Sequence, residues 1–492
     1  MNSKPINVLY VTPESLPYVR IHSLGDISYS FVMAMRDEGV DIRLMMPRYG
    51  TISERMHQIH FINRLTNIKI PMGKELIPAS IKSSSMNTPR TKVQAYITNN
   101  EKYFSSHKGI YRDAKTLELY PDNPERYMYF DKSVVETCNL IEWVPDIVHI
   151  VDGESSLVPA FFKLLYPEKF QKTKFVLTIH NFEEQVEAGK LIYDNLGIPK
   201  KFKNDFYHKN KFNFLKAGII YSDAITTSNH LYKQAILENP ELSNGLAEFI
   251  GNKEFLSIPI GIEPWTWDPK RDKLIAYKME YDFEDFKYNN KIDLCNKFGI
   301  DFDPTIPVFG LILDVNEYEA IDYFTENAAE IFKNENLIVL TIARVEQKYR
   351  NTFNLLQKKY KRNFRVLYTN DLSYFHQLFA GSDFYLSFDN HEPTSLNVMY
   401  AANYGAIPIV NDYFIDRKIF KPYDPKKNDG FAMIFKKEDK PQLYDYIREA
   451  LKIFDDKDSL NEIIENARSQ KFSWNEGAKE YKSLYTRLIK GK

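Results

Sequence analysis

Short apolar runs and amphipathic segments alternate along most of the chain. The runs are rich in Val, Ile and Leu, and the segments between them carry apolar residues at helical spacing. Continuous apolar strands that alternate with helices are typical of parallel sheets covered on both faces. The expected strands are INVLYV (6–11), DIRLMM (41–46), DIVHIV (146–151), KFVLTIH (174–180), DAITTS (223–228), PVFGLIL (307–313), LIVLTI (337–342), FRVLYT (364–369), FYLSF (384–388) and IPIV (407–410).

The expected strands fall into two series, which predict an α/β fold with two doubly wound domains. A chain of 492 residues is also too long for one core. The polar, aromatic stretch 264–304 is predicted to be an irregular linker between the domains. Residues 70–130 are predicted to form a long excursion from the first sheet, and residues 472–489 form one amphipathic helix.

The first helix has readable ends. Asp26 is predicted as its N-cap, and Ile27 and Phe31 begin an apolar face at helical spacing. Gly39 follows the last apolar position and is predicted as the C′ residue that ends the helix.

Charge and cysteine content narrow the class of protein. Lys plus Arg number 65 and Asp plus Glu 66, so the net charge of −1 gives no reason to expect nucleic acid or an anionic membrane as a partner. The only cysteines, Cys138 and Cys295, have no metal-ligand or redox spacing. The first apolar run is too short for a signal peptide, and no run approaches a membrane span. These features predict a soluble, cytoplasmic protein.

The stretch FYLSFDNHEPTSLNVMYAANYGAIPIV (384–410) places Glu392 and Pro393 just after an expected strand. Ligands of open α/β sheets bind at the carboxyl ends of the strands, so this turn is a candidate ligand site. Backbone N–H groups at a helix start bind anions, and the Glu392 carboxylate could accept hydroxyl protons. The alternative is a carboxylate that only complements the helix dipole, worth about 0.3–1 kcal/mol.

An ordered series of motifs then suggests a family. It comprises VLYVTPESLPYVRIHSLGD, IRLMMPRYG, LYPDNPERYMYF, WVPDIVH, LTIHN, FLKAGIIYSDAITTS, IGIEPWTWDP, HEPTSLNVMYAANYGAIPIV and FSWNEGAKEY. In this order the series resembles the bacterial glycogen synthases and plant starch synthases, which are glycosyltransferases of the GT-B architecture. The resemblance implies two Rossmann-like domains that face a cleft. The first would be residues 1–258 with the returning helix 471–492, and the second would be residues 259–470.

The resemblance also implies an activity, which is transfer of glucose from ADP-glucose or UDP-glucose to the non-reducing end of an α-1,4-glucan. Configuration would be retained, with no metal and no cofactor. It assigns Glu392 and His180 to catalysis, Arg20, Gly25, Asp26, Pro393, Thr394 and Ser395 to the donor, and Asp122, Asn123 and Arg126 to the acceptor. Each assignment has a structural alternative: His180 as a satisfied strand-end histidine, Asp26 as a cap, and the last three as local turn contacts.

The donor-phosphate motif departs from the family. Where the family has an arginine and a lysine after the first strand of the second domain, this chain has Asp314 and Glu319. The similar segment ARVEQK (343–348) follows the next strand, so Arg344 and Lys348 are predicted not to replace the missing pair. Asp314 and Glu319 are predicted to point toward the diphosphate position.

Other donor elements are changed as well. The first loop lacks the family's two glycines, a Trp-His pair is replaced by Gly153-Glu154, and a Thr-Gly-Gly turn by NDYFIDR. Loss of one preorganised transition-state donor costs roughly 2.7–4 kcal/mol, so ordinary activity is in doubt. Two hypotheses follow: a transferase with a changed donor or a relocated cation, and a silent relative that binds glucan or serves as scaffold for a protein partner.

Overall fold

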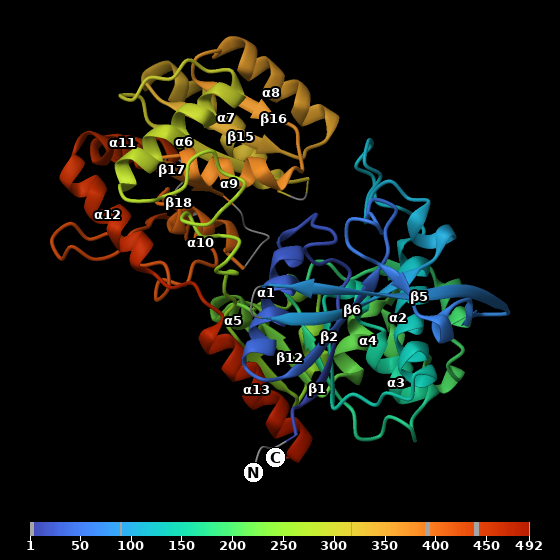
Figure 1. Ribbon diagram of the computed structural model, residues 1–492. Coiled ribbons are helices and arrows are strands. Elements are labelled where there is room, and N and C mark those ends of the chain that lie inside the picture. Colours follow the sequence, from blue (N-terminus) through green and yellow to red (C-terminus); the bar gives the residue numbers. More distant parts are fainter. Residues whose placement is uncertain (1–3, 89–90, 316, 389–393, 437–441, 492) are drawn as a thin grey trace. The chain divides into compact units, whose positions relative to one another are not determined.

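The computed structural model describes residues 4–88, 91–315, 317–388, 394–436 and 442–491. The chain forms two compact units (Figure 1). The first consists of Met1–Gly261 together with Trp474–Lys492, and the second of Ile262–Ser473. None of the described helices combines the length and the apolarity that crossing a bilayer requires.

The described part of the first unit is built around a ten-stranded sheet, in the order β13-β12-β8-β7-β1-β2-β6-β5-β3, with β4 paired to β5. Its strands are β1 (Asn7–Val11), β2 (Asp41–Pro47), β3 (His60–Phe61), β4 (Ile68–Met72), β5 (Glu75–Asn87), β6 (Lys92–Asn99), β7 (Ile147–Val151), β8 (Lys174–Thr178), β12 (Ala224–Thr227) and β13 (Glu254–Ser257). Pairing from β13 to β6 is parallel, and β3, β4 and β5 pair antiparallel. A small sheet joins β9 (Glu187–Ala188), β10 (Tyr207–His208) and β11 (Lys211–Asn213).

Six helices of the described chain belong to the first unit. They are α1 (Ser23–Asp37), α2 (Asn123–Leu140), α3 (Val158–Leu165), α4 (Phe214–Tyr221), α5 (His230–Glu238) and α13 (Asn475–Lys490). In Figure 1 α13 runs along α1, although the two helices lie at opposite ends of the chain.

The last helix is tied to the first sheet by buried hydroxyl groups. The Tyr485 hydroxyl lies 2.6 Å from His149 Nδ1. The Tyr481 hydroxyl lies 3.2 Å from Thr178 Oγ1 and 3.1 Å from Thr226 Oγ1. Burial lowers the pKa of His149 to about 3, so this histidine is a neutral part of the core.

The second unit holds a six-stranded sheet among its described residues, and each strand pairs parallel with its neighbours in the order β16-β15-β14-β17-β18-β19. The strands are β14 (Val308–Leu313), β15 (Ile338–Ala343), β16 (Phe364–Leu367), β17 (Phe384–Ser387), β18 (Ile407–Asn411) and β19 (Met433–Phe435). The helices are α6 (Phe283–Phe298), α7 (Tyr318–Asn334), α8 (Gln347–Lys359), α9 (Leu372–Gly381), α10 (Leu396–Asn403), α11 (Gln442–Asp455) and α12 (Lys457–Ser469).

The predicted fold class is confirmed, since each of the ten apolar runs contains a strand. Two expectations about the intervening segments are wrong. Residues 264–304 are not all irregular, because they contain α6, which packs on α9 through Leu294. The excursion 70–130 is not separate from the first sheet, because β5 and β6 belong to it. Both strands are too polar to show as apolar runs.

The predicted start of the first helix is also wrong. The helix begins at Ser23, and His22 is its N-cap. Asp26 lies inside the first turn, where its carboxylate pairs with Arg20. The other end is as predicted, because Gly39 has φ +82° and its N–H donates to the Arg36 carbonyl.

Candidate functional site

A buried acid–histidine pair lies at the carboxyl edge of the first sheet. Asp152 follows β7 and His180 follows β8, and these strands are neighbours. Asp152 Oδ2 is 2.9 Å from His180 Nδ1, and Asp152 Oδ1 accepts the His180 backbone N–H at 2.7 Å. The relative exposures are only 5% and 8%. The ring of His180 is therefore held in one orientation by both a side-chain and a main-chain contact.

Asp152 has an unusual backbone. Its φ of 53° and ψ of −171° lie next to a region that is populated almost only by glycine. Such a conformation costs roughly 1–3 kcal/mol and persists where the surroundings fix it. Here the two hydrogen bonds to His180 supply part of that constraint. Strained residues of this kind cluster at functional sites, which makes the pair the strongest candidate in this unit.

The neighbouring Gly153 has no room for a side chain. A Cβ atom at this position would come within 2.7 Å of the Glu184 carbonyl oxygen and 3.0 Å of a Val186 methyl group. The Glu184 carbonyl and the Val186 side chain therefore occupy the space in which a side chain at position 153 would begin.

Glu14, which follows β1, is a site residue that the sequence interpretation missed. Its carboxylate accepts N–H groups of Ile21 at 2.6 Å and His22 at 3.2 Å, and the Tyr111 hydroxyl at 3.0 Å. The side chain is fully buried, and burial raises its pKa to about 7. The signal was present, because a carboxylate directly after a buried strand is the same pattern that drew attention to Glu392.

Glu154 adds to the acidity of this edge. Burial, followed by the Glu184 and Asp152 carboxylates, raises its pKa well above the ordinary value. The edge of the first sheet therefore carries two carboxyl groups, Glu14 and Glu154, whose pKa values are raised. Carboxyl groups form hydrogen bonds with hydroxyl-rich ligands, and they repel anions when they are ionised.

The first loop is closed by an ion pair. Arg20 Nε lies 2.5 Å from Asp26 Oδ2, with side-chain exposures of 11% and 3%. Gly25 lies in the helix against the loop, and a Cβ there would approach the Val19 oxygen and the Arg20 Cα at 3.1 Å. Gly25 thus allows the loop to pack on the helix. A donor contact by these three residues stays a prediction.

The three predicted acceptor residues surround the start of α2. Arg126 is fully buried, and its guanidinium donates to the carbonyls of Tyr103 at 2.5 Å and Ile110 at 3.1 Å and to Asn123 Oδ1 at 2.8 Å. Asp122 Oδ2 lies 3.3 Å from His107 Nε2. These contacts fit the structural alternative, in which the residues fix the loop before α2. Acceptor binding by them stays a prediction.

At the carboxyl edge of the second sheet, Asp314 and Arg344 form an ion pair. They follow the neighbouring strands β14 and β15. Arg344 Nε and Nη2 lie 2.9 and 2.7 Å from Asp314 Oδ1, and Nη2 lies 2.6 Å from Oδ2. The Asp314 carboxylate is thus directed at Arg344. The other reversed position, Glu319, is exposed in the first turn of α7.

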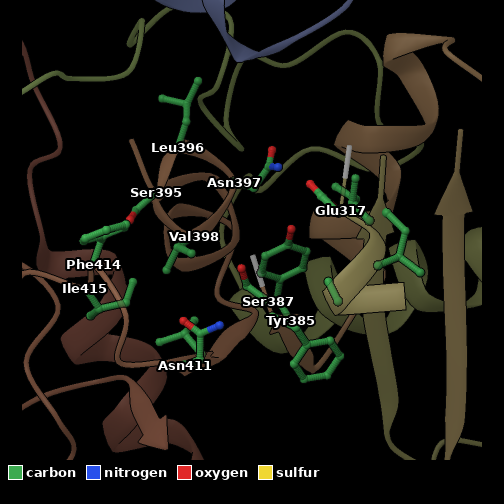
Figure 2. A pocket seen from close by; sticks show the side chains of 15 residues that line it. Glu317, Tyr385, Ser387, Ser395, Leu396, Asn397, Val398, Asn411, Phe414 and Ile415 are labelled. Carbon is green, nitrogen blue, oxygen red and sulfur yellow. The ribbon is translucent and has the colours of Figure 1, made fainter. Parts of the chain in front are cut away.

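A small pocket opens beside this pair, with a volume of about 30 Å³. That is room for about two water molecules. Figure 2 shows the side chains of Tyr385 and Ser387 from β17 between Asn411 from β18 and Glu317, which precedes α7. Its polar lining is made of hydroxyl, amide and carboxylate groups.

One residue of the predicted donor turn, Ser395, lines this pocket. It is the N-cap of α10, with φ of 55° in the left-handed region, and Thr394 beside it is buried. Glu392 and Pro393 lie outside the described residues. Their assigned roles stay predictions, as does a common cleft lined by Glu392, His180 and Gly25.

The described residues contain no group of three or more His, Cys, Asp or Glu side chains arranged to hold a metal ion.

Comparisons with known proteins agree with this architecture. Residues 7–252 match the family defined by the starch synthase catalytic domain. Glycogen synthases from Pelodictyon phaeoclathratiforme and Clostridioides difficile are each 28% identical, over 99% and 98% of this chain and 100% and 99% of theirs. The catalytic domain of starch synthase IV from Arabidopsis thaliana, bound to ADP and acarbose, superimposes with a TM-score of 0.86 at 20% identity, over 99% of this chain and all of that one.

The two α/β units therefore have the GT-B fold, and the family match makes the protein a glycosyltransferase. With half of its length matched by the family model and nearly all of it by curated relatives, the chain belongs to the glycogen/starch synthase family. Family membership implies a nucleotide-sugar donor and a glucan acceptor.

Proposed function

We propose that this protein is a glucosyltransferase that elongates an α-1,4-glucan from a nucleotide-glucose, at a lower rate than a relative with an intact phosphate motif would reach. The Asp152–His180 pair carries the proposal, because it keeps a strand-end histidine buried and oriented where the resemblance places the donor sugar. The Arabidopsis relative bound to ADP makes ADP-glucose the first donor to test. We place the activity in the cytoplasm, where the buried Cys138 and Cys295 would stay reduced.

One observation favours a second candidate, a glucan-binding protein without transfer activity. The arginine that reaches the edge of the second sheet is paired with Asp314. A carboxylate at this place opposes a diphosphate ligand by Coulomb repulsion. Such a protein would still offer the first unit to glucan, and it could act beside a partner protein.

Glucose incorporation separates the two candidates. The purified protein is incubated with maltooligosaccharide and either ADP-glucose or UDP-glucose, and the chain length of the product is measured. Elongation that is lost in His180→Ala and kept in the control His60→Ala, which changes an exposed histidine of β3, supports the transferase. Absence of elongation with both donors, together with calorimetric binding of maltooligosaccharide, supports the second candidate.

A further inference from the structure

The Asp314 carboxylate has the surroundings of a bound anion. Besides three contacts from the Arg344 guanidinium, it accepts the N–H of Val315 at 2.5 Å. An arginine fork with a backbone N–H shortly before a helix is a donor set that proteins use for phosphate and carboxylate ligands. In this protein the anion that occupies these donors is part of the chain.

The position of this arrangement is that of a ligand site. β14 and β15 are adjacent parallel strands near the middle of the second sheet, and their carboxyl ends form the edge at which open α/β sheets bind ligands. The preceding backbone N–H is used in the same manner, because the N–H of Asp314 donates to Glu317 Oε2 at 2.9 Å. Glu317 also lines the adjoining pocket. The backbone N–H groups of Asp314 and Val315 and the guanidinium of Arg344 thus all donate to carboxylates of the same chain.

We infer that Arg344 is the group that binds the donor diphosphate, and that Asp314 is a built-in competitor which must leave Arg344 before the diphosphate can bind. The inference rests on the proposed function for the identity of the ligand. It replaces the expectation that Arg344 lies too late in the chain to serve. The sequence places Arg344 one strand later, but neighbouring strand ends lie side by side, and its guanidinium reaches the end of β14.

The competition sets the specificity of the site. A ligand must interact with the guanidinium more strongly than a tethered carboxylate does, which favours the concentrated charge of a diphosphate over a single phosphate group. The apparent affinity is the intrinsic affinity multiplied by the fraction of molecules in which Arg344 has been released. Removal of the Asp314 charge should therefore tighten binding without any new contact.

Calorimetry with ADP as the probe tests this assignment on the full chain. We expect weak binding by the unaltered protein and about tenfold tighter binding by Asp314→Asn, which keeps the shape of the side chain. The double variant Asp314→Asn with Arg344→Gln should return to within about threefold of the unaltered protein. The matched control is Asp293→Asn, which breaks an ion pair with Lys297 at 2.6 Å on α6 and should leave ADP binding unchanged.

Three results would overturn the inference: tight ADP binding by the unaltered protein, no gain in a folded Asp314→Asn, or a gain that survives the loss of Arg344. Asp314→Ser provides the same test if the asparagine variant does not fold. The two proposals fail separately. If Asp314→Asn binds ADP more tightly but the protein does not elongate glucan, only the proposed transferase activity is refuted. If the protein elongates glucan but Asp314→Asn shows no gain in ADP affinity, only the role of Asp314 is refuted.

Discussion

The carboxylates at the carboxyl edges of the two sheets have different partners. At the first edge, Glu14 and Asp152 are buried and are held by backbone N–H groups, a tyrosine hydroxyl and a histidine ring. At the second edge, Asp314 is 25% exposed and meets a guanidinium group in three close contacts. The same side-chain chemistry is thus stabilised by hydrogen bonds in one unit and by an opposite charge in the other.

This difference indicates what each edge is suited to bind. Carboxylates held by hydrogen bonds keep free lone pairs that can accept further hydrogen bonds from hydroxyl groups, which a sugar offers. A carboxylate paired with arginine is electrically balanced, so that edge presents little net charge until the pair opens. The comparison predicts that substitutions at the first edge act mainly on stability and sugar contacts, and those at the second mainly on anion binding.

The largest effect is expected at Asp152. Replacement of Asp152 by alanine leaves the His180 N–H and Nδ1 without these partners in a buried setting and keeps the unfavourable backbone conformation. We expect a loss of roughly 2–4 kcal/mol in unfolding free energy. Urea denaturation measures the unfolding free energy, and Asp194→Ala, at an exposed position, is the control. A change below about 0.5 kcal/mol would show that the pair does not hold this edge together.

Next in size is the pH dependence caused by Glu14. Its pKa is raised from 4.5 to about 7 in the folded protein, chiefly by burial. A raised carboxyl pKa contributes stability that is fully present below pH 4.5 and is lost as the pH rises through 7, by up to roughly 3 kcal/mol. Unfolding free energy measured from pH 4.5 to 8 should therefore fall more steeply for the unaltered protein than for Glu14→Gln. If the unfolding free energies of the two proteins changed in parallel with pH, the Glu14 carboxyl would be solvated in the folded protein.

At the second edge, a double-mutant cycle should give a smaller energy. Asp314→Asn, Arg344→Gln and the combined variant are expected to show a coupling of about 1–2 kcal/mol, since the pair is bidentate but only partly buried. Arg448 and Glu335 provide the reference, because they lie 3.7 Å apart on the surface of the same unit and should couple by under about 0.5 kcal/mol. If the two pairs had equal coupling energies, the Asp314–Arg344 pair would be no more than an ordinary surface ion pair, and the charge pairing that distinguishes the second edge would have no energetic weight.

The smallest effect is expected at Ser395, and it has the opposite sign. Glycine adopts the left-handed backbone of this position without the steric cost that a Cβ incurs, so Ser395→Gly should stabilise the protein by about 0.5–1 kcal/mol. Ser373→Gly, at the start of α9 with ordinary helical geometry, should destabilise instead. Thermal unfolding compares the two, and a loss of stability in both would mean that the Ser395 side chain contributes more than its backbone costs.

The sequence predicted the framework of the molecule better than its charged contacts. Apolar runs revealed the buried parallel strands, whereas β5 alternates exposed and buried residues and carries three consecutive serines, so no apolar run marked it. Asp26 is a residue type that is common at N-caps, but in the structure its carboxylate pairs with Arg20, six residues earlier. Local patterns do not contain such pairings.

Asp314 shows the same limit over a longer distance. The reversed charge was visible in the sequence, and the repulsion argument followed from it directly. Its partner Arg344 lies 30 residues later and comes close only because β14 and β15 are adjacent in the sheet. Glu14 could have been noticed, because it follows a buried strand as Glu392 does, but its burial depends on Tyr111 and the loop around Ile21.

The return of α13 to the first unit has a consequence for synthesis on the ribosome. The second unit is one continuous stretch and can fold as it emerges, whereas the first unit waits for Tyr481 and Tyr485 before its hydroxyl network with His149, Thr178 and Thr226 can form. Premature termination should therefore produce an unstable first unit rather than an active fragment, and a stable isolated first unit requires residues 1–261 to be joined to 474–492.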